Sequence, residues 1–397
     1  MKQLTIILFL FLTGHFFLLS GQLLVLTDST QLSLLTCSPG PNAYEKFGHT
    51  AIRILDETQS VDVVANWGLF DFDEPGFYYK FVKGETYYNL GIHETFYFLE
   101  SYRQRNSRVT EQILNLSKAD KQRLLDAILI NNLPENRKYL YNFVFDNCAT
   151  RPRDMIAELF SGEKMQYNLE PQIKTYREWI AHYAGKNSWL MFGIDLVFGK
   201  DADAVAPRWE TMFLPEVLSD EFGKVQVVRK GSISSEPLMG EKRIIVEKSD
   251  LEEKINPFPP FVTTLILLFI GLIITFSEYK RKKHYKLFDS LLLFVTGLAG
   301  LIIFYLMFFS IHPLVKVNFN ILWCMPLNLF VAVLVWIKSV GKIVKTYQIL
   351  YIVLILTAFI IAVLSIQSFN VAFLLIMSLL LVRALYWLYF YKNKASF

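Results

Sequence analysis

The 397-residue sequence lacks the patterns by which several common kinds of ligand site are recognised. Its six histidines and three cysteines have no metal-ligand spacing, so we expect no metal site. It has no Walker-type or dinucleotide-binding glycine pattern and no internal repeat, and we expect the protein to work without a cofactor. Charged residues make up only 19% of the chain and hydrophobic residues 53%. This composition is too apolar for one ordinary soluble domain.

The longest apolar runs lie at the two ends of the chain. Residues 4–20 form an apolar run behind Lys2, which is typical of a signal peptide ending near residue 21. An uncleaved anchor is the alternative. Beyond residue 257 there are five apolar stretches, one of them interrupted, each long enough to cross a hydrocarbon core of about 30 Å as a helix. They lie at 258–277, 288–310, 320–337, 347–366 and 370–391.

Basic residues are concentrated in two of the loops between these predicted spans. The first loop holds five and the third holds three, at Lys280, Arg281, Lys282, Lys283 and Lys286, and at Lys338, Lys342 and Lys345. The positive-inside rule places both loops in the cytoplasm and the segment before residue 258 outside. Residues 258–397 carry a formal charge of +10, whereas 3–257 carry −7. The basic excess is therefore an orientation signal and does not support nucleic-acid binding.

Residues 22–257, between the signal peptide and the spans, have the patterns of a mixed α+β domain with an antiparallel sheet. Strands are predicted at 31–37, 49–55, 61–67, 86–91 and 109–116, with a small strand pair within 224–246. Helices are predicted at 95–103, 117–131 and 153–160, with a short one starting within 71–75 and a mainly helical region over 165–218. The predicted organisation is therefore a signal peptide (1–21), an exported α+β domain (22–257) and a helical membrane bundle (258–397).

Two short motifs in the exported domain carry reactive side chains. They are Phe-Gly-His-Thr at 47–50 and Asn-Phe-Val-Phe-Asp-Asn-Cys at 142–148. A cysteine before a helix gains thiolate stabilisation from the helix dipole, and a neighbouring imidazolium lowers its pKa further. Pro152 fits only the first turn of such a helix, which then begins just after Cys148. We predict Cys148 as a nucleophile and His49 as its base.

A third side chain should orient the imidazole of His49. The strand predicted next to it offers Asp62 and Asn66, and Asp71 lies just beyond. We choose Asn66 because it follows His49 by one hairpin, although each of the three also suits a turn or cap.

Polar residues around the motifs are candidates for substrate binding. Asp146, Asn147 and Arg151 surround Cys148 and could bind a headgroup or an oxyanion, or they could form a hydrogen-bonded turn. His312, at the outer end of the second span, could line a lipid-headgroup site, or belong to an ordinary interfacial loop.

The cysteines also allow a non-catalytic interpretation. Cys37 and Cys148 both lie in the exported segment, where an oxidising environment favours a structural disulfide. In that case the chain would be a membrane protein without a reactive thiol.

Four sequence blocks resemble one family. They are the motif at 47–50, Asn-Trp-Gly-Leu-Phe-Asp-Phe at 66–72, Tyr-Asn-Phe-Val-Phe-Asp-Asn-Cys-Ala-Thr-Arg at 141–151 and His-Pro at 312–313. Their order and spacing resemble the Lnb family, lipoprotein N-acyltransferases of Bacteroidota with a periplasmic domain joined to a transmembrane domain. The order of histidine before cysteine is also similar to the circularly permuted NlpC/P60 papain-like hydrolases.

The resemblance implies a permuted NlpC/P60 papain-like periplasmic domain, followed by an all-α transmembrane bundle of about five helices. It implies that Cys148 takes a fatty acyl chain from a membrane phospholipid and passes it to the α-amine of a diacylated lipoprotein at the inner membrane. The alternative is a periplasmic cysteine peptidase or amidase of the same fold that acts on cell-wall peptides.

Overall fold

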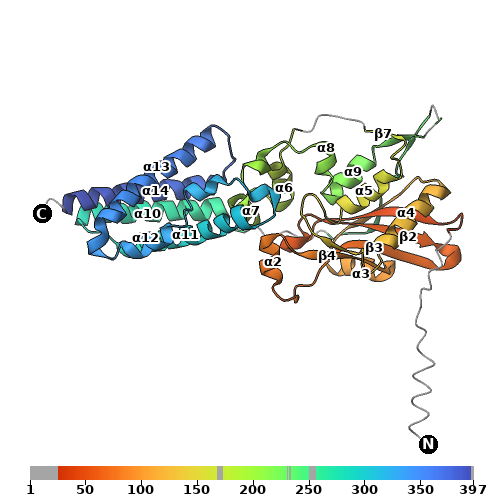
Figure 1. The fold of residues 1–397 in the computed structure, drawn as a ribbon, viewed down its shortest axis with the longest axis horizontal. Coiled ribbons are helices and arrows are strands. Elements are labelled where there is room, and N and C mark those ends of the chain that lie inside the picture. Colours follow the sequence, from red (N-terminus) through yellow and green to blue (C-terminus); the bar gives the residue numbers. More distant parts are fainter. Residues whose placement is uncertain (1–25, 168–172, 230, 232–233, 250–255, 395–397) are drawn as a thin grey trace, which may run out of the picture.

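A computed structural model describes residues 26–167, 173–229, 231, 234–249 and 256–394. The signal peptide predicted at 1–21 lies outside these residues. The chain forms an elongated molecule with a sheet domain at one end and a bundle of long helices at the other (Figure 1). We refer to the described residues from 26 to 249 as the sheet domain and to those from 256 to 394 as the membrane bundle.

The sheet domain is built on a seven-stranded antiparallel sheet with the strand order β10-β5-β1-β2-β3-β4-β6. All five strands predicted before residue 117 are present, and the bounds predicted for the first, 31–37, agree with those observed. The strands are β1 (Gln31–Cys37), β2 (His49–Asp56), β3 (Val61–Leu69), β4 (Tyr87–Glu94), β5 (Val109–Ile113), β6 (Lys138–Leu140) and β10 (Arg243–Val246).

Both faces of this sheet are covered. Successive side chains of a strand point to opposite faces, so Leu34 and Ile52 pack under one layer of helices and Leu35 and Ala51 face the other way. The first layer contains α4 (Lys118–Asn131), α5 (Thr150–Glu158) and α9 (Pro215–Phe222), and the second contains α3 (Thr95–Gln104). Figure 1 shows α5 and α9 on one side of the sheet and α3 on the other.

Other elements of the sheet domain depart from the sequence prediction. The short helix expected to start within 71–75 begins later, as α2 (Phe77–Lys83), because the Asp71 carboxylate accepts the Asp73 amide in a turn that ends at Gly76 with φ of +74°. The strand pair expected within 224–246 becomes three strands. Two of them, β8 (Gln226–Val228) and β9 (Ser235–Pro237), join β7 (Lys164–Gln166) in a small second sheet.

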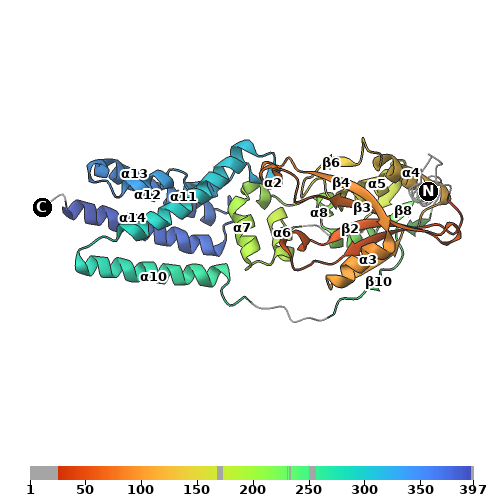
Figure 2. The same cartoon turned by 90° about the horizontal axis from the view of Figure 1, so that it is seen from below.

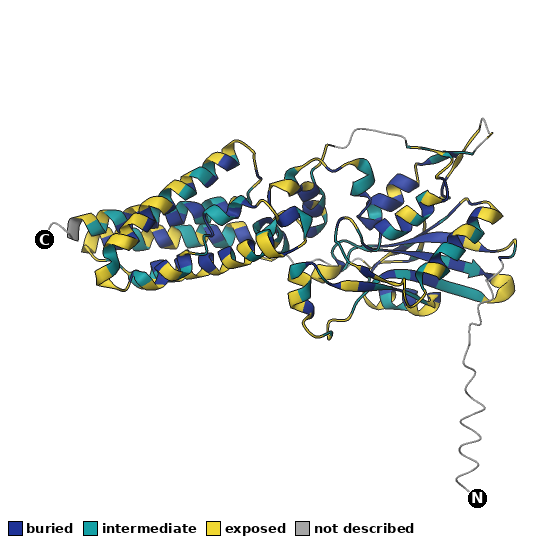
Figure 3. Cartoon of the chain, viewed as in Figure 1, coloured by how far each residue is buried: buried dark blue, intermediate teal, exposed yellow. Residues whose placement is uncertain are grey.

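Four helices of the membrane bundle are long and apolar enough to cross a bilayer. They are α10 (Pro260–Arg281), α11 (Lys286–Phe309), α13 (Gly341–Val363) and α14 (Val371–Lys394). Their large apolar side chains are exposed on the outside of the bundle, and the buried residues face inward (Figure 3). That pattern is expected of helices whose solvent is lipid.

The stretch predicted at 320–337 is not one continuous helix. It contains a 3₁₀ turn, η5 (Phe319–Leu322), and the short helix α12 (Asn328–Leu334), separated by a break that includes Pro326. Side chains replace the helical hydrogen bond that the Trp323 carbonyl lacks at this break. The Tyr351 hydroxyl donates to this carbonyl at 2.7 Å, and the Asn328 side-chain amide donates to it at 3.4 Å.

This broken segment lies directly against α11. A Cβ added at Gly300 would overlap the carbonyl oxygen of Cys324, and one at Gly297 would meet Leu329. Such close approach requires glycine, which explains why the α11 residues here are small. The segment therefore runs along α11 as a broken span between the outer and inner ends of the bundle.

The sheet domain is fixed to one end of the bundle by α6 (Tyr176–Ala184) and α7 (Trp189–Val197) (Figures 1 and 2). The rings of Phe192 and Phe373 lie 4.8 Å apart, and the Asn320 amide donates to the Asp195 carbonyl at 2.9 Å. The loops that are rich in basic residues lie at the opposite end of the bundle. This arrangement places the sheet domain on the outer side, as the loop charges predict.

Candidate active site

The turn that carries Cys148 is held in place by Asn147. The buried Asn147 side chain accepts hydrogen bonds from the amides of Ala149 and Thr150 at 2.8 and 2.9 Å, which caps the start of α5. Its amide group donates to the carbonyls of Phe143 and Phe213 at 2.8 and 2.9 Å. Its hydrogen-bonding capacity is thus used within the protein, so of the two interpretations that the sequence left open the structure favours the hydrogen-bonded turn for Asn147.

Asp146 and Arg151 also support this turn. Two hydrogen bonds of 2.7 and 2.8 Å join the Arg151 guanidinium to the Asp146 carboxylate, and the guanidinium lies 3.9 Å from the centre of the Tyr139 ring. Because Asp146 precedes Cys148 and Arg151 follows it, the ion pair joins the two sides of the turn. Bidentate pairs of this kind fix geometry as well as charge.

His49 is the first residue of β2, and its imidazole is held by a residue of β3. The ring Nε2 lies 2.6 Å from the Asn66 Oδ1, so Nε2–H donates to Asn66. The two other candidates are engaged elsewhere: Asp62 accepts two hydrogen bonds from Arg53, and Asp71 caps its own turn. The structure therefore brings Asn66, of the three, to His49.

The thiol of Cys148 and the imidazole of His49 perturb each other. Burial raises the pKa of Cys148, but the charge of His49 and hydrogen bonds from His49 and the backbone amides of Thr50 and Cys148 lower it more, so the pKa falls below its usual value. Burial lowers the pKa of His49, but the charge of Cys148 and hydrogen bonds to Cys148 and Asn66 outweigh it and raise the pKa. Both shifts favour a thiolate beside an imidazolium.

Gly68 lies between these two side chains. It has φ of +99° and stands where the β3–β4 register shifts between Trp67 and Leu69. A Cβ at this position would lie 3.5 Å from both the Cys148 Cβ and the His49 Cε1. Glycine keeps this space open, and sequence reasoning missed it, although a glycine inside a strand pattern is a recognised signal of a bulge.

Three tyrosines form an aromatic wall near Cys148. Burial raises the pKa of Tyr88 to about 12, with a further contribution from the charge of Cys148. Burial also raises the pKa of Tyr139 and Tyr141, and Cys148 again contributes. The buried Tyr139 hydroxyl has no hydrogen-bond partner among the described residues. The wall therefore offers neutral hydroxyls and apolar ring faces.

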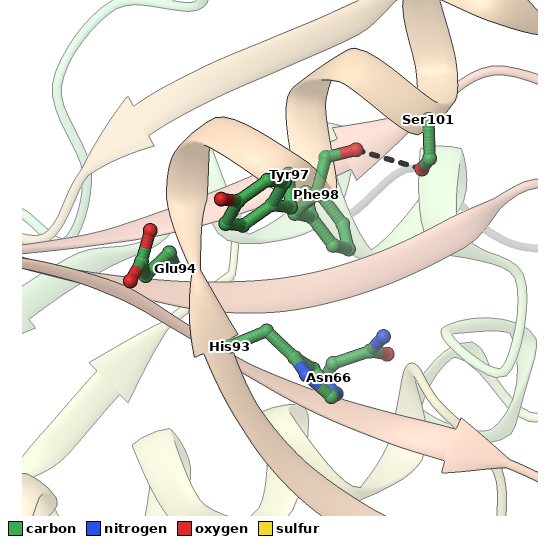
Figure 4. Close-up of a pocket in the computed structure, with 6 residues that line it drawn as sticks. All are labelled: Asn66, His93, Glu94, Tyr97, Phe98 and Ser101. Atoms are coloured by element: carbon green, nitrogen blue, oxygen red, sulfur yellow. Dashed lines mark hydrogen bonds between the residues drawn. The ribbon is translucent and has the colours of Figure 1, made fainter. Parts of the chain in front are cut away.

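A hollow of about 540 Å³ adjoins Asn66 on the α3 side of the sheet (Figure 4). The side chains of Asn66 and His93 lie together at one side of it, and Tyr97 and Phe98 come from α3. The lining residues are Asn66, His93, Glu94, Tyr97, Phe98 and Ser101. The hollow thus borders the residue that orients His49, and it combines polar and aromatic contacts.

The structure places His312 at the junction of the two parts of the chain. Its Nε2 lies 2.8 Å from the Phe81 carbonyl oxygen, to which it donates, and its backbone amide donates to the Ser310 hydroxyl. The sequence suggested a headgroup site here. The observed contacts instead tie the outer end of α11 to α2.

All three cysteines are free thiols in the structure. Cys37 is fully buried, and burial raises its pKa well above the ordinary value, so it is a poor nucleophile. Cys324 is buried in the membrane bundle. Within the described residues, no three His, Cys, Asp or Glu side chains are grouped to hold a metal ion.

Comparison with known families covers both parts of the chain. The family model of the Lnb N-terminal periplasmic domain matches residues 25–182, and that of the Lnb transmembrane domain matches residues 251–394. Searches of curated proteins and of solved structures found no match. The two matched models follow each other in the order of the sheet domain and the bundle, so the protein is a multi-pass membrane protein with a periplasmic domain. The chain belongs to the Lnb family.

Proposed function

We propose that this chain is a lipoprotein N-acyltransferase of the inner membrane that works through an acyl thioester on Cys148. The observation that carries the proposal is the position of Cys148 beside His49, whose imidazole Asn66 orients at 2.6 Å, in a periplasmic domain fixed to the outer ends of membrane helices; the lowered pKa of Cys148 supports it. A thiolate is the reactive form of cysteine, and this one lies on the side of the membrane where lipoproteins mature. Family membership supports the same activity.

In the first half-reaction, the Cys148 thiolate attacks the ester carbonyl of a phospholipid acyl chain. His49 holds the thiol proton and gives it to the glycerol oxygen as the ester bond breaks, which releases a lysophospholipid and leaves an acyl thioester. Because the Nε2 of His49 donates to Asn66, Nδ1 is the ring nitrogen that exchanges this proton. The backbone amides of Thr50 and Cys148, which lower the thiol pKa, are suitable donors for the oxyanion.

In the second half-reaction, the α-amine of the lipoprotein's N-terminal cysteine attacks the thioester carbonyl. His49 accepts the amine proton, an amide bond forms, and Cys148 leaves as a thiolate. An amine attacks a thioester more readily than an oxygen ester, which gives the covalent intermediate its chemical purpose. Donor and acceptor are both anchored in the outer leaflet, so membrane attachment raises their effective concentration at Cys148.

Mass spectrometry of lipoprotein N-terminal peptides tests this function. Cells that have no other N-acyltransferase would carry either the wild-type chain or the Cys148→Ser variant. We expect the amide-linked chain with the wild type and diacylated N-termini with the variant. The Cys37→Ser variant is the matched control, since this thiol is buried and its pKa is raised, and it should behave as wild type.

The same experiment addresses the alternative function. If the N-termini are triacylated with Cys148→Ser, the transferase proposal fails. Cleavage of cell-wall peptides by the purified wild-type chain, lost in the variant, would then identify a cysteine hydrolase in which water resolves the intermediate.

A further inference from the structure

Helix α2 presents large apolar side chains that the other described elements leave exposed. Tyr78 is 72% exposed, and Tyr79, Phe81 and Val82 are also exposed large side chains. The charged residues of this helix are Lys80 and Lys83, and each is paired with a neighbouring glutamate. A soluble surface rarely gathers this much aromatic area in two turns of helix, so the helix has a partner of low polarity.

The C-terminal end of α2 is fastened to the outer end of membrane helix α11. The Lys83 carbonyl accepts hydrogen bonds from the Ile311 amide at 2.8 Å and from the Ser310 hydroxyl at 3.2 Å. The His312 imidazole donates to the Phe81 carbonyl at 2.8 Å. These bonds leave α2 beside the last turn of a span, where Figure 1 also shows it.

One ring contact sets the depth of α2 relative to the bilayer. The rings of Tyr79 and Tyr305 lie 6.3 Å apart. Tyr305 precedes the end of α11 at Phe309 by one helical turn, which is about 6 Å along the axis at 1.5 Å per residue. The exposed rings of Phe304 and Phe308 lie at the same level of α11. The aromatic surface of α2 is therefore continuous with the lipid-facing surface of the span, in the layer where membrane proteins concentrate aromatic residues.

From α2 a row of aromatic rings leads to the nucleophile. The rings are, in order, Phe81, Phe77, Phe70, Tyr88 and Tyr141, with neighbouring centroids 6.2, 5.7, 4.8 and 4.0 Å apart. The row ends near Cys148, since Tyr141 and Cys148 both pack against the core cluster that contains Tyr88, and the charge of that thiol contributes to the raised pKa of both tyrosines.

We propose that α2 lies in the outer leaflet and that this row of rings is the access route for the phospholipid acyl donor. One acyl chain leaves the bilayer along the rings, so that its ester carbonyl reaches Cys148 while the other chain stays in the membrane. The rings shield the chain from water, which would otherwise oppose its extraction. The access route rests on the proposed acyl transfer, whereas the position of α2 in the leaflet stands independently of it.

An environment-sensitive label tests the position of α2 without any need for activity. The full chain with Cys148→Ser and Tyr78→Cys would be labelled with nitrobenzoxadiazole on the new thiol and placed in nanodiscs of phosphatidylethanolamine and phosphatidylglycerol. The two native thiols that are left, Cys37 and Cys324, are buried, so the label goes to position 78. The control is Phe96→Cys, an aromatic residue of α3 that is 65% exposed. We expect lipids with a nitroxide near the ester end of the acyl chain to quench the label at position 78 but not at 96. Equal, water-like emission at both positions would overturn the proposal.

Release of lysophospholipid then tests the access route. The Tyr78→Asp/Val82→Asp variant changes two exposed residues one turn apart on α2, and we expect release to slow about tenfold or more because charge opposes insertion in the interface. Phe96→Asp should release lysophospholipid at the wild-type rate. Wild-type release from the α2 variant would refute the route even if position 78 is quenched. If the wild-type chain releases no lysophospholipid, the proposed function and the route both fail, and the quenching alone decides whether α2 is in the leaflet.

Discussion

Replacement of Asn66 by alanine should slow acyl transfer without unfolding the protein. Asn66 holds the imidazole of His49 through one hydrogen bond of 2.6 Å, and its carbonyl oxygen faces the ring nitrogen that stays protonated. A hydrogen bond to a group that becomes charged contributes about 1.5–3 kcal/mol. Loss of that contribution in the transition state corresponds to a decrease of about 10- to 150-fold in kcat/KM. Asn66 acts through His49, so it is a positioning residue.

The matched control for this prediction is Asn66→Asp. Aspartate keeps an oxygen in place to accept from Nε2–H, so most of the activity should remain, and its charge should raise the pKa of His49 further. Alanine should lower that pKa, because the bond to Asn66 is one of the causes that raise it. The assay is the pH dependence of thioester formation, measured as lysophospholipid released by each variant in nanodiscs. The basic limb of the profile should move to higher pH with aspartate and to lower pH with alanine.

Two results would refute this reasoning. Wild-type rates with Asn66→Ala would show that the observed bond does not support the base. Equal loss in the alanine and aspartate variants, with no movement of the pH profile, would show that Asn66 acts by packing alone.

Three further predictions concern the thiol, the gap beside it and the acid stability of the sheet domain. The alkylation rate of Cys148 by iodoacetamide should inflect below the ordinary cysteine pKa of about 8.5, and His49→Ala should move the inflection upward, since burial remains while the imidazolium is lost. Gly68→Ala should cost about 1–2 kcal/mol of unfolding free energy, because φ is +99°, and should also slow acyl transfer, because the added methyl group would contact both the Cys148 Cβ and the His49 Cε1; thermal melts and lysophospholipid release separate the two effects. Burial raises the pKa of Asp120, but hydrogen bonds from Ser117 and two arginines lower it more, from 3.8 to about 2. Asp120→Asn should therefore cost about 2 kcal/mol of unfolding free energy at pH 7. Denaturation at several pH values should show this cost disappearing as the pH falls from about 4 to 2.

The strands of the sheet could be predicted from sequence because their patterns are local. Residues 31–37 form a short, mostly apolar run whose side chains are almost all buried, as expected of a strand covered on both faces, and the breaker residues that follow it mark the turn to the next strand. Cys148 and His49 could be chosen because each is one of very few reactive side chains outside the membrane. Their proximity could not be derived in the same way, since it depends on how α5 packs against the end of β2.

What sequence reasoning missed depends on long-range contacts. For Asn147 and His312 the sequence left two interpretations open, substrate binding or a local structural role. Each side chain donates to backbone carbonyls, Asn147 to those of Phe143 and Phe213 and His312 to that of Phe81, which favours the structural role. No spacing rule predicts such a partner 66 or 231 residues away. The sequence shows that one of the apolar stretches is interrupted, but it could not show that the Tyr351 hydroxyl of a neighbouring helix bonds the Trp323 carbonyl at the break in the third span.

The way the two parts are joined decides how a lipid can reach Cys148. The buried Arg177 binds Asp195 and Asp203, and Asp195 in turn accepts a hydrogen bond from Asn370 at the outer end of α14. The buried side chain of Asn318 donates to the Leu196 carbonyl at 2.8 Å, which adds a second polar connection from the bundle. Buried polar connections of this kind leave a costly unsatisfied group if they are broken, so the sheet domain, with Cys148, is held in one position on the outer end of the bundle. A nucleophile held in one position cannot dip into the leaflet to find an ester. In the proposed acyl transfer the donor therefore has to rise to it, and the row of rings from α2 is the apolar route that we propose for its chain.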